Sequence, residues 1–219
     1  MPPSARLPKK PPREEKNHPK IIQVVLVGIG SELMFEVVVA AAMLRRLCPQ
    51  LRVRVVNVTD LMILEAETLH PHSLTNDEFD ALFTTDKPIH FNYHGYSNEI
   101  KGLLFGRPKI DRMSIACYKE EGSTTTPFDM MLRNGVSRFH IMEAAIKGGA
   151  KSNEKVALDM TGLLGEIRHQ VSKIQAYIME TGKDPQGTFD VPRFEGTVFE
   201  GGKKDNEGGG SKEDGFFVN

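Results

Sequence analysis

Short runs of β-branched and apolar residues alternate with longer amphipathic stretches over most of the chain. The runs have the length and composition of buried strands, and the stretches between them have the spacing of helices. Strands that alternate with helices predict a three-layer α/β sandwich with a mostly parallel sheet. The expected strands are 21–27, 52–58, 88–93 and 113–118, and the expected helices are 33–47, 75–83, 98–105 and 137–147.

Two local signals predict helix ends. Thr75 and Glu78 have the Ser/Thr-x-x-Glu spacing of a capping box, which should open a helix. The pair Gly148-Gly149 should close the helix that begins near residue 137, because glycine is favoured just beyond a helix end.

The glycine turn after the first strand raises the question of a dinucleotide site. Gly28 and Gly30 fit the start of that motif, but Leu33 stands where a third glycine would let helix and strand approach closely. The turn therefore predicts a tight connection between strand and helix, with Ser31 as the N-cap.

The last regular element is a long helix over 153–181. Its apolar residues recur at spacings of three and four, which places them on one stripe. We expect this stripe to pack across the domain; an exposed stripe would instead bind a partner. Its members are Val156, Met160, Leu163, Ile167, Val171, Ile174 and Ile178.

The two ends differ in composition from the domain predicted at 21–182. Residues 1–20 are rich in proline and basic residues, and residues 183–219 are rich in glycine and charge. Neither segment has enough apolar surface to order itself, so both are predicted to be disordered. A basic leader can also be a nuclear or nucleic-acid patch, which is the less favoured interpretation here.

Composition narrows the possible partners. A formal net charge of -1 gives no overall attraction to nucleic acid or to a membrane surface. No apolar run approaches the roughly 20 residues that span a bilayer. Cys48 and Cys117 are too few and too far apart for a metal or redox motif, which predicts buried thiols in a cytoplasmic protein.

The most distinctive block of the sequence runs from Tyr118 to Met130. Its threonines precede Pro127, which suits the first turn of a helix, and a Ser or Thr hydroxyl can cap that helix. Exposed N–H groups in such a turn can also bind phosphate. The block thus predicts either a capping loop or an anion site with Lys119 beside it. The candidate anion-binding or interface residues are His94, Lys119, Gly122, Ser123, Thr124, Thr125 and Thr126.

Three histidines deserve separate consideration. His94 stands at the expected carboxyl end of a strand, where open α/β sheets gather ligands. His70 and His72 flank a proline, and no further His or Cys spacing completes a metal site with them. They are expected to be loop residues. We predict no metal site and assign no catalytic proton transfer to any residue.

Several blocks, in order and spacing, resemble the C-terminal domain of xylulose 5-phosphate/fructose 6-phosphate phosphoketolase, a member of the transketolase-like superfamily. The resemblance covers about residues 24–181. The glycine turn resembles the first turn of the third domain of transketolases. The blocks are 53–62, 70–75, 78–88, His94-Gly95-Tyr96 and Tyr118 to Met130.

This resemblance implies a transketolase C-terminal type of fold. Phosphoketolases use thiamine diphosphate and magnesium to split a ketose phosphate with inorganic phosphate into acetyl phosphate and an aldose phosphate. Their cofactor lies between the first two domains of paired subunits, and the third domain supports the dimer. The resemblance therefore implies no cofactor in this chain, and partners that are phosphoketolase N-terminal and middle domains or a second subunit.

The chain departs from that family pattern in ways that change the expectation. The first two domains have no counterpart in it, and Ser97 replaces the usual proline after His-Gly-Tyr. We therefore expect a domain that supports assembly and is inactive alone, from a split or a partial gene. The open alternatives are a stand-alone assembly subunit and a regulatory module that binds phosphate or a sugar phosphate.

Overall fold

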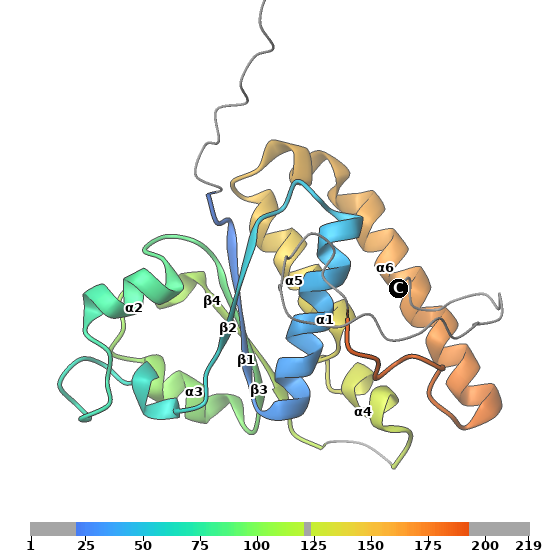
Figure 1. Cartoon of the computed structure of the whole chain (residues 1–219), viewed down its shortest axis with the longest axis horizontal. Helices are drawn as coiled ribbons and strands as arrows, with labels where there is room; N and C mark the ends of the chain where they lie inside the picture. Colours follow the sequence, from blue (N-terminus) through green and yellow to red (C-terminus); the bar gives the residue numbers. More distant parts are fainter. Residues whose placement is uncertain (1–20, 121–123, 193–219) are drawn as a thin grey trace, which may run out of the picture.

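The computed structural model describes residues 21–120 and 124–192. Within these ranges one sheet contains the strands in the order β2-β1-β3-β4, and each neighbouring pair is parallel (Figure 1). All of the predicted strands are confirmed, with ends that differ by a few residues at most. The strands are β1 (Val24–Ile29), β2 (Val53–Asn57), β3 (Ile89–His94) and β4 (Met113–Tyr118).

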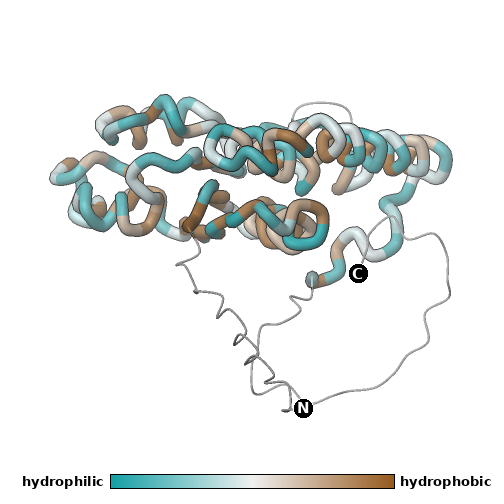
Figure 2. Tube along the Cα trace, turned by 90° about the horizontal axis from the view of Figure 1, so that it is seen from above, coloured by the Kyte–Doolittle hydropathy of each residue, from teal (hydrophilic) through white to brown (hydrophobic). Residues whose placement is uncertain are grey.

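Helices cover both faces of the sheet, which confirms the predicted three-layer α/β sandwich with a long C-terminal helix. Figure 2 shows the layers from above, with hydrophobic and hydrophilic stretches alternating along the helices. One face carries α2 (Asn76–Phe83) and α3 (Ser97–Leu104). The other face carries α1 (Ser31–Leu47), α4 (Pro127–Arg133), α5 (Arg138–Ala150) and α6 (Glu154–Thr181).

The central strand β1 explains why both faces need cover. All of its residues are buried, and successive side chains point to opposite faces of the sheet. Val24 and Leu26 pack in the core beneath α1 and α5, whereas Val25 and Val27 pack in the core beneath α2 and α3. A strand that is apolar on both sides is stable only between two helix layers.

The helix starts follow the sequence in one case and depart from it in another. The capping box is confirmed, because the Glu78 N–H donates to Thr75 Oγ1 at 3.2 Å and the Thr75 N–H donates to Glu78 Oε2 at 2.9 Å. Ser31 as N-cap was wrong. Gly30 holds that position with φ 98°, and Ser31 is already the first helical residue. The turn needs a left-handed φ, which glycine adopts without strain.

The expectation that Gly148-Gly149 ends its helix was also wrong. Helix α5 continues through both glycines to Ala150. A Cβ on Gly149 would lie 2.3 Å from Leu51 Cδ1, and one on Gly148 would lie 3.2 Å from Pro88 Cβ. The glycines therefore serve close packing of α5 against neighbouring segments rather than termination.

Two short 3-10 helices, η1 (Leu61–Leu64) and η2 (Ile110–Arg112), were not predicted. The first is held by Arg107, whose side chain is only 3% exposed. The Arg107 guanidinium donates to the backbone carbonyls of Ile63, Leu64 and Glu65 and lies over the Phe79 ring. One buried cation thus holds the connection between β2 and α2.

Helix α6 packs across the domain as predicted, mainly against α5. Of the predicted stripe, Val156, Ile167, Ile174 and Ile178 are buried, and the remaining members are half-buried against the same core. Leu164 is buried as well. Asn153 caps the helix, because its Oδ1 accepts from the N–H groups of the first turn.

The described chain continues past the predicted domain boundary at residue 182. Within residues 183–192, Pro185 and Thr188 are buried, whereas Phe189 and Val191 are exposed. The reason is a polar contact that composition does not reveal, since the Thr188 carbonyl accepts from Arg138 at 2.8 Å. The predicted disorder of residues 1–20 and of 193–219 concerns segments that lie outside the described residues.

The Thr188 carbonyl contacts a buried ion pair, Glu36 with Arg138, that joins distant segments. Glu36 and Arg138 are 0% and 1% exposed. The Arg138 Nε donates to Glu36 Oε2 at 3.0 Å, the Nη2 donates to Oε1 at 2.5 Å, and the Arg138 backbone N–H donates to Oε2 at 2.6 Å. The guanidinium also lies 4.8 Å from the centre of the Phe128 ring. This pair links α1, α4, α5 and the segment after α6.

Two further expectations concern the cysteines and membranes. Cys48 and Cys117 are free and buried, as predicted, and burial raises the pKa of both thiols. Among the described residues, no helix combines the length and apolarity that crossing a membrane requires.

Removing one member of the Glu36–Arg138 pair should destabilise the fold strongly. Arg138→Met leaves a buried carboxylate without its partner, so we expect a loss of roughly 3–5 kcal/mol in the free energy of unfolding. Urea denaturation measures the loss. The double variant Glu36→Leu with Arg138→Met removes both charges and should recover most of it. A single variant that loses less than about 1 kcal/mol, as an exposed pair would, contradicts this description.

Candidate functional site

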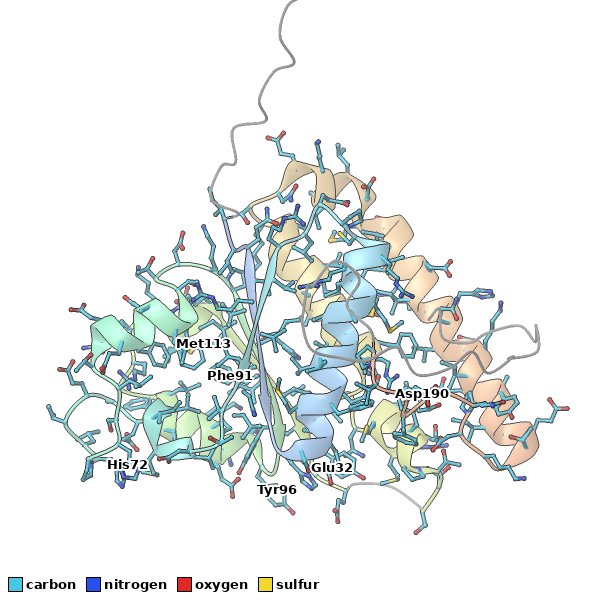
Figure 3. All side chains as sticks on the ribbon, in the orientation of Figure 1. Glu32, His72, Phe91, Tyr96, Met113 and Asp190 are labelled. Carbon is cyan, nitrogen blue, oxygen red and sulfur yellow. The ribbon has the colours of Figure 1, made fainter. Side chains whose placement is uncertain are left out.

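The carboxyl ends of the strands form the candidate site. Within the sheet, β2 lies next to β1 toward one edge, and β3 lies next to β1 toward the opposite edge. The strand order therefore reverses between β1 and β3. Helices α1 and α3 leave these two strands on opposite faces. Ligands in open α/β sheets bind at such a position. Glu32 and Tyr96 lie at this end of the sheet in Figure 3.

His94, at the end of β3, is surrounded by residues from the neighbouring strand ends. Its Nδ1 lies 3.6 Å from Glu32 Oε2, and its Nε2 lies 3.8 Å from Glu120 Oε1. Its ring meets the Tyr118 ring edge-on at 5.0 Å between centres. We call Glu32, His94, Tyr118 and Glu120 the strand-end cluster. It is partly open to solvent, with the His94 side chain 38% exposed.

The electrostatics of the strand-end cluster favour hydrogen-bond donors over anions. The pKa of Glu32 is lowered by its own backbone N–H and then by the Ser31 hydroxyl, which stabilise the ionised carboxylate. An imidazole between two carboxylates can form a hydrogen bond with a hydroxyl group. A phosphate group would meet repulsion from the same carboxylates.

The backbone brings the cluster together through Gly30. A Cβ at this position would lie 3.0 Å from the Cβ of His94, and its φ of 98° is unfavourable for other residues. The glycine turn therefore allows the start of α1 and the end of β3 to touch. The glycine turn could be recognised in the sequence, but the spacing of its glycines did not indicate that His94 lies beside Gly30.

The structure confirms the capping role that was predicted for the threonine block. Thr126 caps α4, since the Asp129 N–H donates to Thr126 Oγ1 at 3.3 Å, and Pro127 is the first helical residue. The Phe128 N–H donates to Asp184 Oδ2 at 3.2 Å. Two N–H groups that could have held an anion are therefore already paired within the domain.

The other candidate residues of this block lie nearby along the chain. Thr124 is exposed and Thr125 is half-buried. The Lys119 N–H donates to Asn134 Oδ1 at 3.4 Å. Gly122 and Ser123 lie outside the described residues. Anion binding by the block stays a prediction. Of the candidate anion-binding or interface residues, His94 belongs to the strand-end cluster.

Sequence reasoning missed a line of polar residues on β3. His90, Asn92 and His94 alternate with Phe91 and Tyr93, so they share one face of the strand. His90 Nδ1 lies 2.9 Å from Ser114 Oγ, and the Asn92 side-chain amide donates to the Val136 carbonyl at 3.0 Å. The alternation of polar and aromatic residues is visible in the sequence. The polar residues run from the strand end to the core beneath α5.

The loop histidines form a turn rather than a metal centre. His72 Nδ1 lies 2.7 Å from Asp60 Oδ2, and the His72 N–H donates to His70 Nδ1 at 3.1 Å. No group of three or more His, Cys, Asp or Glu residues in the described ranges is arranged to hold a metal ion.

One cavity of about 200 Å³ lies between α5 and α6. Glu143 crosses it toward Arg168, with 3.6 Å between Oε1 and Nε, and pairs with Lys147 at 2.7 Å. The carboxylate of Glu143 is therefore paired with two cations of the same helix layer. The cavity is lined by Phe139, His140, Glu143, Arg168, Val171 and Ser172.

Comparisons with known proteins agree on one family. Residues 13–193 match the family model described as the XFP C-terminal domain. A protein named "Probable phosphoketolase" from Schizosaccharomyces pombe is 47% identical over 171 residues, which is 78% of this chain and 20% of that protein. One of the same name from Mesorhizobium japonicum is 41% identical over 166 residues, 74% of this chain and 20% of that protein. The chain thus spans about one fifth of the length of these relatives.

Acidification should destabilise the domain through His90. Burial, and then repulsion from His140, lower the pKa of His90 to about 4. Between pH 6.5 and 4 the unfolded chain binds a proton at His90, whereas the folded chain does not. As the pH is lowered through this window, the free energy of unfolding therefore decreases by up to roughly 3 kcal/mol. His140, whose pKa burial also lowers, adds a loss of the same sign.

Urea denaturation at several pH values tests this contribution. His90→Asn keeps an amide near Ser114 and does not titrate, so its stability should depend less on pH than that of the native chain. His169→Asn, at an exposed position of α6, is the matched control. Equal pH dependence of the native chain and His90→Asn would contradict the assignment.

Proposed function

Because the chain belongs to the phosphoketolase C-terminal domain family, we propose that it serves as the C-terminal domain of a phosphoketolase and supports the assembly of that enzyme. The observation that carries the proposal is the extent of the match. The family model covers residues 13–193, whereas the relatives carry the matched segment as 20% of their length. The remaining four fifths of such an enzyme would supply the domains against which this one packs.

In this proposal the assembly cleaves xylulose 5-phosphate or fructose 6-phosphate with inorganic phosphate, in the cytoplasm, to acetyl phosphate and an aldose phosphate. Thiamine diphosphate with magnesium would supply the carbanion chemistry from the domains that this chain does not match. The assembly would contain paired subunits, as the family resemblance implies.

The residues present do not fit the cofactor. A diphosphate with a divalent metal needs several convergent oxygen ligands, and the described residues contain no suitable group of acidic, His or Cys residues. The strand-end cluster would oppose a diphosphate, because Glu32 and Glu120 flank its one imidazole. We therefore derive no catalytic step from this chain and propose a supporting role for it.

The strand-end cluster suits that supporting role. It is polar and partly exposed, and it lies where the loops of β1, β3 and β4 meet. Such a surface can contact hydroxyl groups of a sugar phosphate or polar residues of the neighbouring domain. An independent phosphate-binding role has less support, because Thr126 and Asp184 already pair the first N–H groups of α4.

Acetyl phosphate formation tests the proposal. The purified chain, given xylulose 5-phosphate, inorganic phosphate, thiamine diphosphate and magnesium, should form no product, because the domains that place the cofactor are elsewhere. The S. pombe relative, shortened by the segment that matches this chain, should form product when it is co-expressed with the chain. The shortened relative alone is the control.

Two outcomes would contradict the proposal. Product from the isolated chain would place a complete cofactor site within it. Absence of product from the co-expressed pair, together with normal activity of the intact relative, would show that this chain does not replace the missing domain.

A further inference from the structure

Helix α6 has a second stripe on the side opposite its buried one. Positions spaced alternately by four and three fall on one helix face, and at 100° per residue this face points directly away from the core. Every position in the stripe is exposed, and none is acidic, Lys or Arg. We call this set the outer stripe, and its members are Leu158, Gly162, Gly165, His169, Ser172, Ala176 and Met179.

The two glycines of the outer stripe have no purpose inside this domain. A Cβ on Gly162 or on Gly165 would meet no atom of the described residues within 4 Å, so alanine would fit both positions. Glycine within a helix weakens it relative to alanine, because the unfolded backbone has more freedom to lose. Both positions therefore reduce the stability of the isolated chain without improving its packing.

The ends of the outer stripe are also unfavourable for an isolated domain. Leu158 is 84% exposed and Met179 is 83% exposed. The stripe between them is about 30 Å long at 1.5 Å per residue. Large apolar side chains stand at both ends of the stripe, and between them the helix surface is low at Gly162 and Gly165, where another backbone can approach closely. Glu166 and Lys173 border it with opposite charges.

We propose that the outer stripe is the docking face for the domains that make up the other four fifths of a phosphoketolase. The inference rests on the proposed function. The buried stripe of α6 packs against the core of the domain, whereas every position of the outer stripe is exposed in the described chain. The relatives hold this domain beside a segment four times its length, which supplies the polypeptide to cover it.

The chemistry of the stripe defines the partner surface. It is an apolar ridge, with side chains that fill the hollow over Gly162 and Gly165 and contact Leu158 and Met179. A helix with medium-sized apolar side chains meets these requirements, since helices pack by setting ridges into grooves. A methyl group added at the hollow would then separate the two backbones.

The glycines allow a test in which folding and docking change in opposite directions. The double variant Gly162→Ala with Gly165→Ala should raise the melting temperature of the chain by roughly 2–4 °C per substitution, because the methyl groups meet open space. The same variant should reduce co-purification with the tagged, shortened S. pombe relative at least about tenfold after co-expression, since overpacking weakens close contacts.

A charge pair gives the matched control. Ala176→Glu places a carboxylate on the outer stripe, whereas Ala81→Glu makes the same change at an exposed position of α2, on the other face of the sheet. We expect Ala176→Glu to abolish co-purification and Ala81→Glu to leave it within about twofold of the native chain, because α2 lies outside the proposed contact.

The outcomes separate this inference from the proposed function. Co-purification that tolerates the glycine variant and Ala176→Glu would keep the proposed function and overturn the docking face. No co-purification of the native chain, with the intact relative folded, would overturn both. Self-association of the chain in sedimentation that Ala176→Glu abolishes, without binding to the relative, would assign the stripe to a second copy and overturn the proposal.

Discussion

The buried pair of Glu36 and Arg138 is the interaction on which the arrangement of this domain depends. A carboxylate and a guanidinium without access to water are tolerated only when their hydrogen-bonding groups are satisfied. Here that requirement fixes four segments at once, because Arg138 also contacts the Thr188 carbonyl and the Phe128 ring. The start of α5, the chain after α6 and helix α1 cannot move independently.

That constraint reaches the candidate site through α1. Glu36 lies one turn beyond Glu32, so the pair that holds Glu36 in the core also sets where the first turn of α1 meets the end of β3. Gly30 completes the approach, because it allows the chain to turn beside His94. The strand-end cluster is thus positioned by a buried contact from one side and by a close backbone approach from the other.

Local patterns predicted the elements well, whereas contacts between distant residues were beyond them. The strands and the Thr75 cap follow from the composition of adjacent residues, and the family resemblance gave the same fold. Glu36 and Arg138 are separated by 102 positions, and nothing near either residue indicates the other. The glycines of α5 show the same limit, since their purpose is contact with Leu51 and Pro88, which lie on other segments.

The domain therefore combines a closely packed interior with an exposed outer stripe on α6. The proposal that the outer stripe is a docking face is tested most directly by the reactivity of a thiol placed on it. Ala176→Cys, at an exposed position of the outer stripe, should react rapidly with an alkylating reagent in the isolated chain, and the native thiols of Cys48 and Cys117 are buried. In the co-expressed complex the rate should fall at least about tenfold, as burial of a site slows access. An unchanged rate in the complex, with Ala81→Cys protected instead, would contradict the account.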